Sequence, residues 1–119
     1  MVSTKPNYIV GIGGSAGGLK AYMALLDALP SRTGMAFVVI AHMSPTGESL
    51  LPHLLSQKTS MPVAQASEGM SIAANHLYVI PPNADLLIEG YTFKVVSPRT
   101  MSKGHHKQID YFLTSLAGP

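Results

Sequence analysis

A serine and a histidine stand where this sequence could most readily do chemistry. Ser15 lies in GIGGSAGG, residues 11–18, in which five of the eight residues are glycine. Residues 13–17 fit G-x-S-x-G, a pattern whose small neighbours allow a sharp turn that exposes a nucleophilic serine. His42 directly follows the apolar run MAFVVIA, and a histidine can accept a serine proton near neutral pH. The two residues predict hydrolysis with Ser15 as nucleophile and His42 as general base.

The elements that must position these two residues form a βαβ unit. The apolar run at Tyr8–Ile12 predicts a buried strand, and MAFVVIA, residues 35–41, predicts a second one. Between them, leucines and other apolar residues recur at helical spacing from Leu19 to Leu29, and Pro30 ends that helix. Because the carboxyl ends of neighbouring parallel strands face one crevice, we expect Ser15 and His42 to approach each other there.

The glycine segment admits two other interpretations. Gly11, Gly13 and Ala16 fit the G-x-G-x-x-A fingerprint of dinucleotide binding, which places a pyrophosphate at a helix N-terminus. That fingerprint expects an acid after the second strand, where this chain has His42. Alternatively, Ser15 only caps the helix. If Ser15 is a nucleophile, the N–H of Ala16 at the helix start is a candidate donor to the oxyanion.

The remaining chain predicts further strands and helices. The elements indicated by apolar spacing are a helix at 48–58, a parallel strand at 61–66, strand-like runs at 76–82, 85–90 and 91–96, a polar loop at 97–107 and a helix from residue 109. The three strand-like runs indicate an antiparallel insertion, and Glu89-Gly90 indicates a hairpin between the last two. The fold class is therefore α/β, a doubly wound, mostly parallel sheet in three αβα layers with a hairpin region.

Composition limits the classes of protein that this chain can belong to. The 119 residues include no cysteine, which excludes disulfides and thiolate metal sites and leads us to expect a cytoplasmic protein. A net charge of +2 is too small to indicate nucleic-acid binding, and no apolar run is long enough to span a membrane. Only 12% of residues are charged, so we expect some apolar surface to meet a partner or further chain.

Several blocks together resemble a known family. IVGIGGSAGGLKA, AFVVIAHMSP, SLLPHLL, TSMPVAQASEGM and NHLYVIPPNADLLI, in this order, are similar to the catalytic domain of CheB-type chemotaxis methylesterases. The resemblance runs from about residue 8 to 117, and SLLPHLL and YVIPPN resemble especially the fused methylesterase–methyltransferase proteins. It implies hydrolysis of glutamate γ-methyl esters and deamidation of glutamines on chemoreceptors, by a Ser-His-Asp triad and without a cofactor.

The resemblance also assigns roles to residues. It implies that Ser15 is the nucleophile and His42 the base, whereas the family's aspartate lies in a later glycine-rich segment that these 119 residues do not contain. Asp27, Asp85 and Asp110 do not match that aspartate. We therefore expect residues 1–119 to form the N-terminal part of one domain with little or no activity. A non-catalytic module that binds a signalling partner stays an open alternative.

The sequence and the resemblance also lead us to expect particular partners. The chain from Lys94 onward is basic, and Arg99 in its loop is a candidate contact for an acidic, methylated receptor. His105-His106 lacks a further ligand, so we expect no metal site. A receiver or methyltransferase domain is an expected neighbour in a longer protein. An exposed sheet edge would favour self-association.

Overall fold

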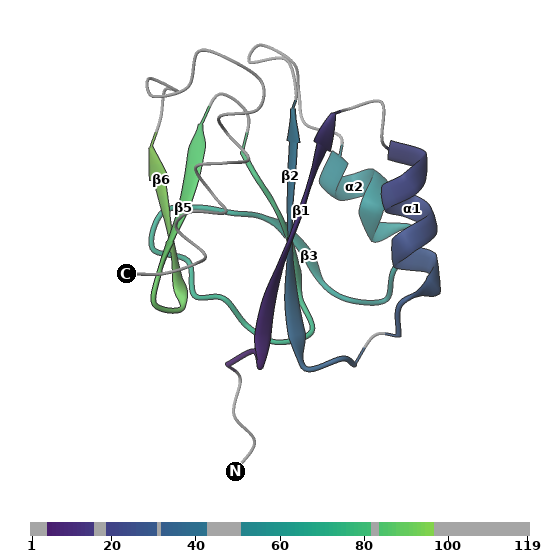
Figure 1. Cartoon of the computed structure of the whole chain (residues 1–119), viewed down its shortest axis with the longest axis horizontal. Helices are drawn as coiled ribbons and strands as arrows, with labels where there is room; N and C mark the ends of the chain where they lie inside the picture. Colours follow the sequence, from purple (N-terminus) through teal and green to yellow (C-terminus); the bar gives the residue numbers. More distant parts are fainter. Residues whose placement is uncertain (1–4, 16–18, 31, 43–50, 82–83, 97–119) are drawn as a thin grey trace.

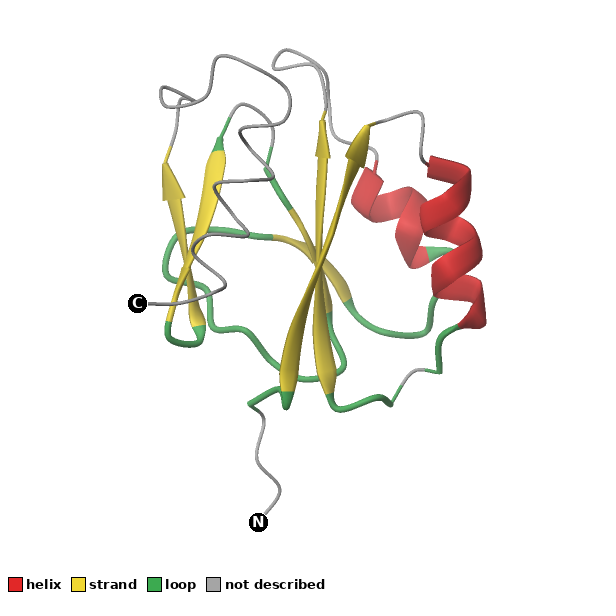
Figure 2. Cartoon of the chain, in the orientation of Figure 1, coloured by secondary structure: helices red, strands yellow, loops and turns green. Residues whose placement is uncertain are grey.

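A parallel sheet with helices on one face organises the molecule. The computed structural model describes residues 5–15, 19–30, 32–42, 51–81 and 84–96. In chain order the elements are β1 (Tyr8–Ser15), α1 (Leu19–Ala28), β2 (Met35–His42), α2 (Leu51–Ser56), β3 (Val63–Gln65), β4 (Leu77–Val79), β5 (Asp85–Glu89) and β6 (Thr92–Val96) (Figures 1 and 2). Neither helix is long and apolar enough to cross a membrane within these ranges.

The sheet has four strands in the order β1-β2-β4-β3, and every pair is parallel. The predicted βαβ unit and the strand at 61–66 are confirmed. The assignment of 76–82 to an antiparallel insertion is wrong, because β4 lies between β2 and β3 in the parallel sheet. Leu77, Tyr78 and Val79 are all buried, and a short strand covered on both faces is a continuous apolar run whatever its direction.

The two faces of β2 are covered by different elements. Within residues 35–40 the odd-numbered side chains pack with the helices and the even-numbered ones with the hairpin, because side chains alternate along a strand. The helix-side cluster includes Phe37, Val39, Leu26 and Leu55, and the hairpin-side cluster includes Val38, Ile40, Leu86 and Phe93. In Figure 1, α1 and α2 lie together on one side of the sheet and β5–β6 on the other. The helix expected from residue 109 lies outside the described residues.

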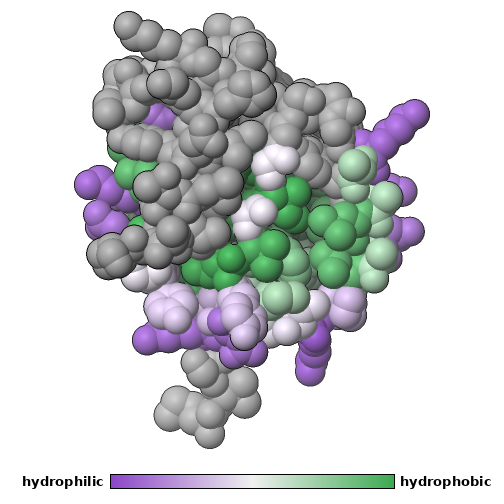
Figure 3. All heavy atoms as spheres, viewed as in Figure 1, coloured by the Kyte–Doolittle hydropathy of each residue, from purple (hydrophilic) through white to green (hydrophobic). Residues whose placement is uncertain are grey.

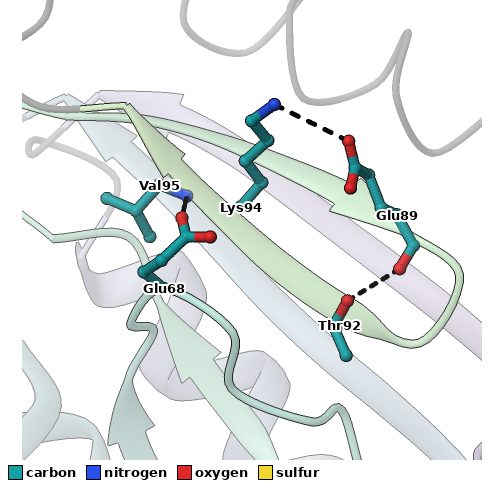
Figure 4. A network of polar contacts seen from close by, with 5 residues as sticks. All are labelled: Glu68, Glu89, Thr92, Lys94 and Val95. Atoms are coloured by element: carbon teal, nitrogen blue, oxygen red, sulfur yellow. Dashed lines mark hydrogen bonds and ion pairs between the residues drawn. The ribbon is translucent and has the colours of Figure 1, made fainter.

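The hairpin is antiparallel, as predicted, and its turn consists of Gly90 and Tyr91, between the paired residues Glu89 and Thr92. Gly90 has a φ of 62°, a left-handed conformation that glycine adopts without steric cost. The Thr92 hydroxyl donates to the Glu89 carbonyl oxygen at 2.8 Å and closes the turn (Figure 4). Lys94 and Glu89 form an ion pair with an N···O distance of 3.7 Å, and both side chains are more than half exposed.

The segment from Glu68 to Met70, which contains a turn at Glu68 and Gly69, lies along β6 and joins the hairpin to the rest of the molecule. The Gly69 N–H donates to the Phe93 carbonyl, and the Phe93 N–H donates to the Met70 carbonyl, at 2.9 and 3.0 Å. The Glu68 carboxylate accepts the Val95 N–H at 2.7 Å (Figure 4). These bonds leave the hairpin with one strand edge paired and its Phe93 side buried against the sheet.

Candidate functional site at the carboxyl edge of the sheet

Ser15 and His42 are the last residues of β1 and β2, and they are partners in the strand register. The pairing starts at Tyr8 with Met35 and continues without interruption to this pair. Neighbouring strands lie about 4.8 Å apart. The register therefore brings the backbones of the two residues to the same edge of the sheet, separated by one strand spacing. In Figure 1 this is the upper edge, where the arrows of β1 and β2 end.

The strand β1 reaches this edge of the sheet as a longer strand than the sequence predicts. The sequence predicts a strand that ends at Ile12, but β1 continues through Gly13 and Gly14 to Ser15. Gly13 and Gly14 pair with Ile40 and Ala41 of β2. Glycine weakens strands through its backbone freedom, but pairing with an ordered neighbour decides whether a strand forms. Ser15 thus ends the strand itself, three residues beyond the predicted end.

The strand that carries His42 is closely packed over most of its length. Residues 36–40 of β2 are all buried, with at most 3% of any of them exposed. On its far side β2 pairs with β4, and the Ile80 N–H extends this ladder by donating to the Val39 carbonyl at 3.0 Å. His42 comes three residues after Val39, directly beyond this closed core. The backbone at His42 is therefore held by a strand with neighbours on both sides.

Several other residues that the sequence singled out are not among those that the structure describes. Ala16, Arg99, Asp110 and the whole basic loop at 97–107 lie outside the described residues. Asp27 is an exposed residue of α1, near the end of that helix.

Asp85 is the residue that the sequence reasoning undervalued. It is the first residue of β5 and is 0% exposed. Its signal in the sequence is a single acid inside the apolar stretch ADLLI. A carboxyl in such a stretch can be exposed or buried, and only the fold distinguishes the two cases.

Metal and ligand sites find little support in the described part of the chain. Within these ranges, no three histidine, aspartate or glutamate residues lie close enough together to hold a metal ion. A surface hollow of about 200 Å³ runs along α1 and is lined there by Lys20, Met23, Ala24, Asp27 and Lys58. Its lining includes neither Ser15 nor His42, so it belongs to the helical face and not to the edge of the sheet.

Comparison with known proteins shows the family of this chain. The family model for the CheB methylesterase domain matches residues 10–118. The chain belongs to the CheB methylesterase family. The match includes both Ser15 and His42, and the family consists of hydrolases of the protein-glutamate methylesterase type.

Individual relatives agree with the family. A protein-glutamate methylesterase/protein-glutamine glutaminase from Hydrogenovibrio crunogenus is 31% identical over 87 residues, which are 72% of this chain and 23% of that protein. One from Mesorhizobium japonicum is 29% identical over 112 residues, 94% of this chain and 33% of that protein. A putative one from Leptospira interrogans is 33% identical over 78 residues, 66% of this chain and 40% of that protein. The chain thus spans less than half of each of these relatives.

A solved structure supports the fold. The catalytic domain of the Thermotoga maritima CheB methylesterase superposes on 98% of this chain with a TM-score of 0.76 and 24% sequence identity. The match covers 61% of the Thermotoga chain. It confirms the α/β fold class predicted from the sequence.

Proposed function

We propose that this chain supplies the nucleophile and the base of a protein-glutamate methylesterase that acts on methylated chemoreceptors. Ser15 is the nucleophile, and His42 is the general base and then the general acid. The observation that carries the proposal is the strand register, which pairs these two residues at the carboxyl edge of a parallel sheet. Deamidation of receptor glutamines follows from the same chemistry, because an amide and an ester are both acyl donors.

The proposed reaction has two balanced steps. His42 accepts the hydroxyl proton of Ser15 as its oxygen attacks the γ-carbonyl carbon of the methyl ester, and the proton then leaves with methanol. In the second step His42 accepts a proton from water, which attacks the acyl-serine and releases the glutamate carboxylic acid and the free serine. The N–H of Ala16 is proposed as one donor to the negative oxygen that forms in each step.

The substrate and the cellular setting are also part of the proposal. Arg99 and the basic residues near it suit an acidic receptor segment, and a receiver or methyltransferase domain is the neighbour that we expect in a longer protein. The reaction is placed in the cytoplasm, in keeping with the absence of cysteine from the 119 residues. The acid that orients His42 is expected from the resemblance in a later segment, so the 119-residue chain alone should turn over little or no ester.

An esterase assay tests the proposal. Methanol release from a methylated receptor fragment is measured for the 119-residue chain, for a form extended through the segment that the relatives possess, and for that form with Ser15→Ala. We expect turnover only in the extended form with Ser15 present, because loss of a triad nucleophile costs a factor of about 10⁶. Turnover that survives Ser15→Ala would refute the assignment.

The alternative is a binding module that keeps the methylesterase fold without its chemistry. Two features favour it: only 12% of the residues are charged, and an apolar face over β1 is partly exposed (Figure 3). A serine-reactive phosphonate separates the two proposals. Covalent modification of Ser15 in the extended form supports the enzyme, and no modification in either form supports the binding module.

A further inference from the structure

Asp85 is the one charged side chain that is fully buried in the described part of the molecule. Its neighbours Ala84 and Leu86 are buried as well, at 1% and 0% exposure. A carboxylate is costly to remove from water unless polar groups hold it, and Asp85 does take part in a hydrogen-bonding or electrostatic interaction. The proposed reaction gives this residue no role, so its burial needs another explanation.

The hairpin shows where this burial is unusual. Leu86 and Ile88 point toward the core, so Asp85, Leu87 and Glu89 occupy the opposite face of β5. Along that face the side chain of Glu89 at the turn is 71% exposed, Leu87 is intermediate and Asp85 is 0% exposed. The outer face of β5 is therefore exposed to solvent near the turn and buried at the open end of the hairpin, where β5 starts and β6 ends. The carboxylate sits at the closed end.

The open end of the hairpin lies at the same end of the molecule as the sheet edge that carries the proposed site. In Figure 1, β5 starts and β6 ends at the upper edge, where β1 and β2 also end. Leu86, the next residue after Asp85, lies in the same buried cluster as Ile40, which comes two residues before His42. A group that fixes the start of β5 therefore also supports the core beneath the end of β2.

We propose that Asp85 is a positioning residue for the site, and this inference rests on the proposed function. Its buried carboxylate anchors the open end of the β5–β6 hairpin against the edge where Ser15 and His42 are paired. It acts through the core that Leu86 shares with Ile40 of β2, and it need not touch the reacting atoms. Loosening this anchor lets the edge move, and small displacements at a reacting centre slow the reaction strongly.

The test compares Asp85→Asn and Asp85→Ala with the matched control Glu89→Gln, which removes a negative charge at the exposed end of the same strand. Two quantities are measured well below the melting temperature, in the extended form of the protein. One is amide hydrogen exchange at residues 13–15 and 40–42. The other is the rate at which a phosphonate modifies Ser15. We expect Asp85→Ala to raise the exchange and to lower the modification rate by about tenfold each, Asp85→Asn to have a smaller effect, and Glu89→Gln to have none.

The outcomes separate the inference from the proposed function. One outcome is that both Asp85 variants melt at a lower temperature but keep the wild-type hydrogen exchange at the site edge and the wild-type rate of Ser15 modification. In that case Asp85 is only a stabilising group and the inference is wrong. If Asp85→Ala does not fold, unchanged exchange in Asp85→Asn overturns it equally. If wild-type Ser15 is never modified, the proposed function fails, and the exchange measurement still decides whether Asp85 anchors this edge.

Discussion

The strands β1 and β2 have the same length and are paired along all of it, but they differ in how they are packed. β2 has partners on both sides, and its residues 36–40 are closed to solvent. β1 is the edge strand of the described sheet, its residues 9–12 are only partly buried, and Tyr8 is 71% exposed. The proposed base therefore comes from a closely packed inner strand and the proposed nucleophile from an edge strand. The core sets the position of His42, whereas the position of Ser15 depends on what lies beside β1.

A matched pair of isoleucines gives the sharpest test of this difference. Ile40 of β2 is 1% exposed, and Ile12 of β1 is partly buried. Ile40→Ala should lower the free energy of unfolding by about 3–4 kcal/mol, because it leaves a cavity in a closed core. Ile12→Ala should cost about 1–2 kcal/mol, because part of that side chain already contacts water. Urea unfolding followed by circular dichroism measures both, and equal losses would break the comparison.

Tyr78 of β4 extends the test to the strand on the other side of β2. Its hydroxyl accepts the Ala73 N–H at 2.9 Å and lies 3.4 Å from the Ser71 carbonyl. Tyr78→Phe leaves the Ala73 N–H without this acceptor and should cost about 1–2 kcal/mol of unfolding free energy. A thermal unfolding series against wild type measures the loss.

Burial also makes the contribution of Tyr78 depend on pH. Burial raises the pKa of Tyr78 above 10.0, partly opposed by the hydrogen bond from Ala73. Because the pKa is higher in the folded than in the unfolded chain, this group adds stability below pH 10 that is lost as the pH rises through the folded pKa. Wild type should therefore lose more stability above pH 10 than Tyr78→Phe does. Parallel alkaline profiles of the two proteins would contradict this.

The edge of β1 predicts weak association between chains. β1 contains no charged residue and no proline, the devices that commonly protect a sheet edge. We expect the 119-residue chain to self-associate with rising concentration, and Tyr8→Lys to reduce this association. Light scattering across a concentration series measures it. A strictly monomeric wild-type chain would show that this edge is protected.

The smallest effect is expected for the exposed ion pair of the hairpin. Glu89 and Lys94 are largely solvated, so Lys94→Ala should change the free energy of unfolding by less than about 0.5 kcal/mol. Glu68→Gln, by contrast, weakens a charge-assisted bond to the Val95 N–H, and we expect a loss of about 1 kcal/mol. Equal losses of unfolding free energy would mean that the exposed ion pair stabilises the hairpin as much as the bond from Glu68 does, which would contradict this expectation.

The parts of the fold that the sequence could predict are those with a strong local pattern. The apolar runs around Val10 and Val38, the leucines of α1 and the glycine at position 90 in the hairpin turn each indicate one element by a local signal. The parallel direction of β4 could not be predicted in this way, because a short buried strand has the same apolar pattern in either direction. Its neighbours, which only the fold supplies, decide the pairing.

The site residues also divide into those that a local pattern could predict and those whose position depends on the fold. Ser15 and His42 could be picked out because each follows an apolar run near the end of a predicted strand. The extension of β1 to Ser15 could not, because the pairing of Gly13 and Gly14 depends on β2. The burial of Asp85 likewise depends on the closure of the hairpin against the sheet, which no local pattern contains.

The central claim is that Ser15 and His42 act as one unit, and the pH dependence of Ser15 modification tests it most directly. The rate of phosphonate modification is measured from about pH 5 to about pH 9 in the extended protein and in its His42→Gln variant, with mass spectrometry to locate the label. The account predicts a wild-type rate that rises through a pKa near that of histidine, about 6.5. In His42→Gln this inflection should vanish, and the rate should fall by about 10² or more. The same inflection and a similar rate in His42→Gln would contradict the pairing of these two residues in one reaction.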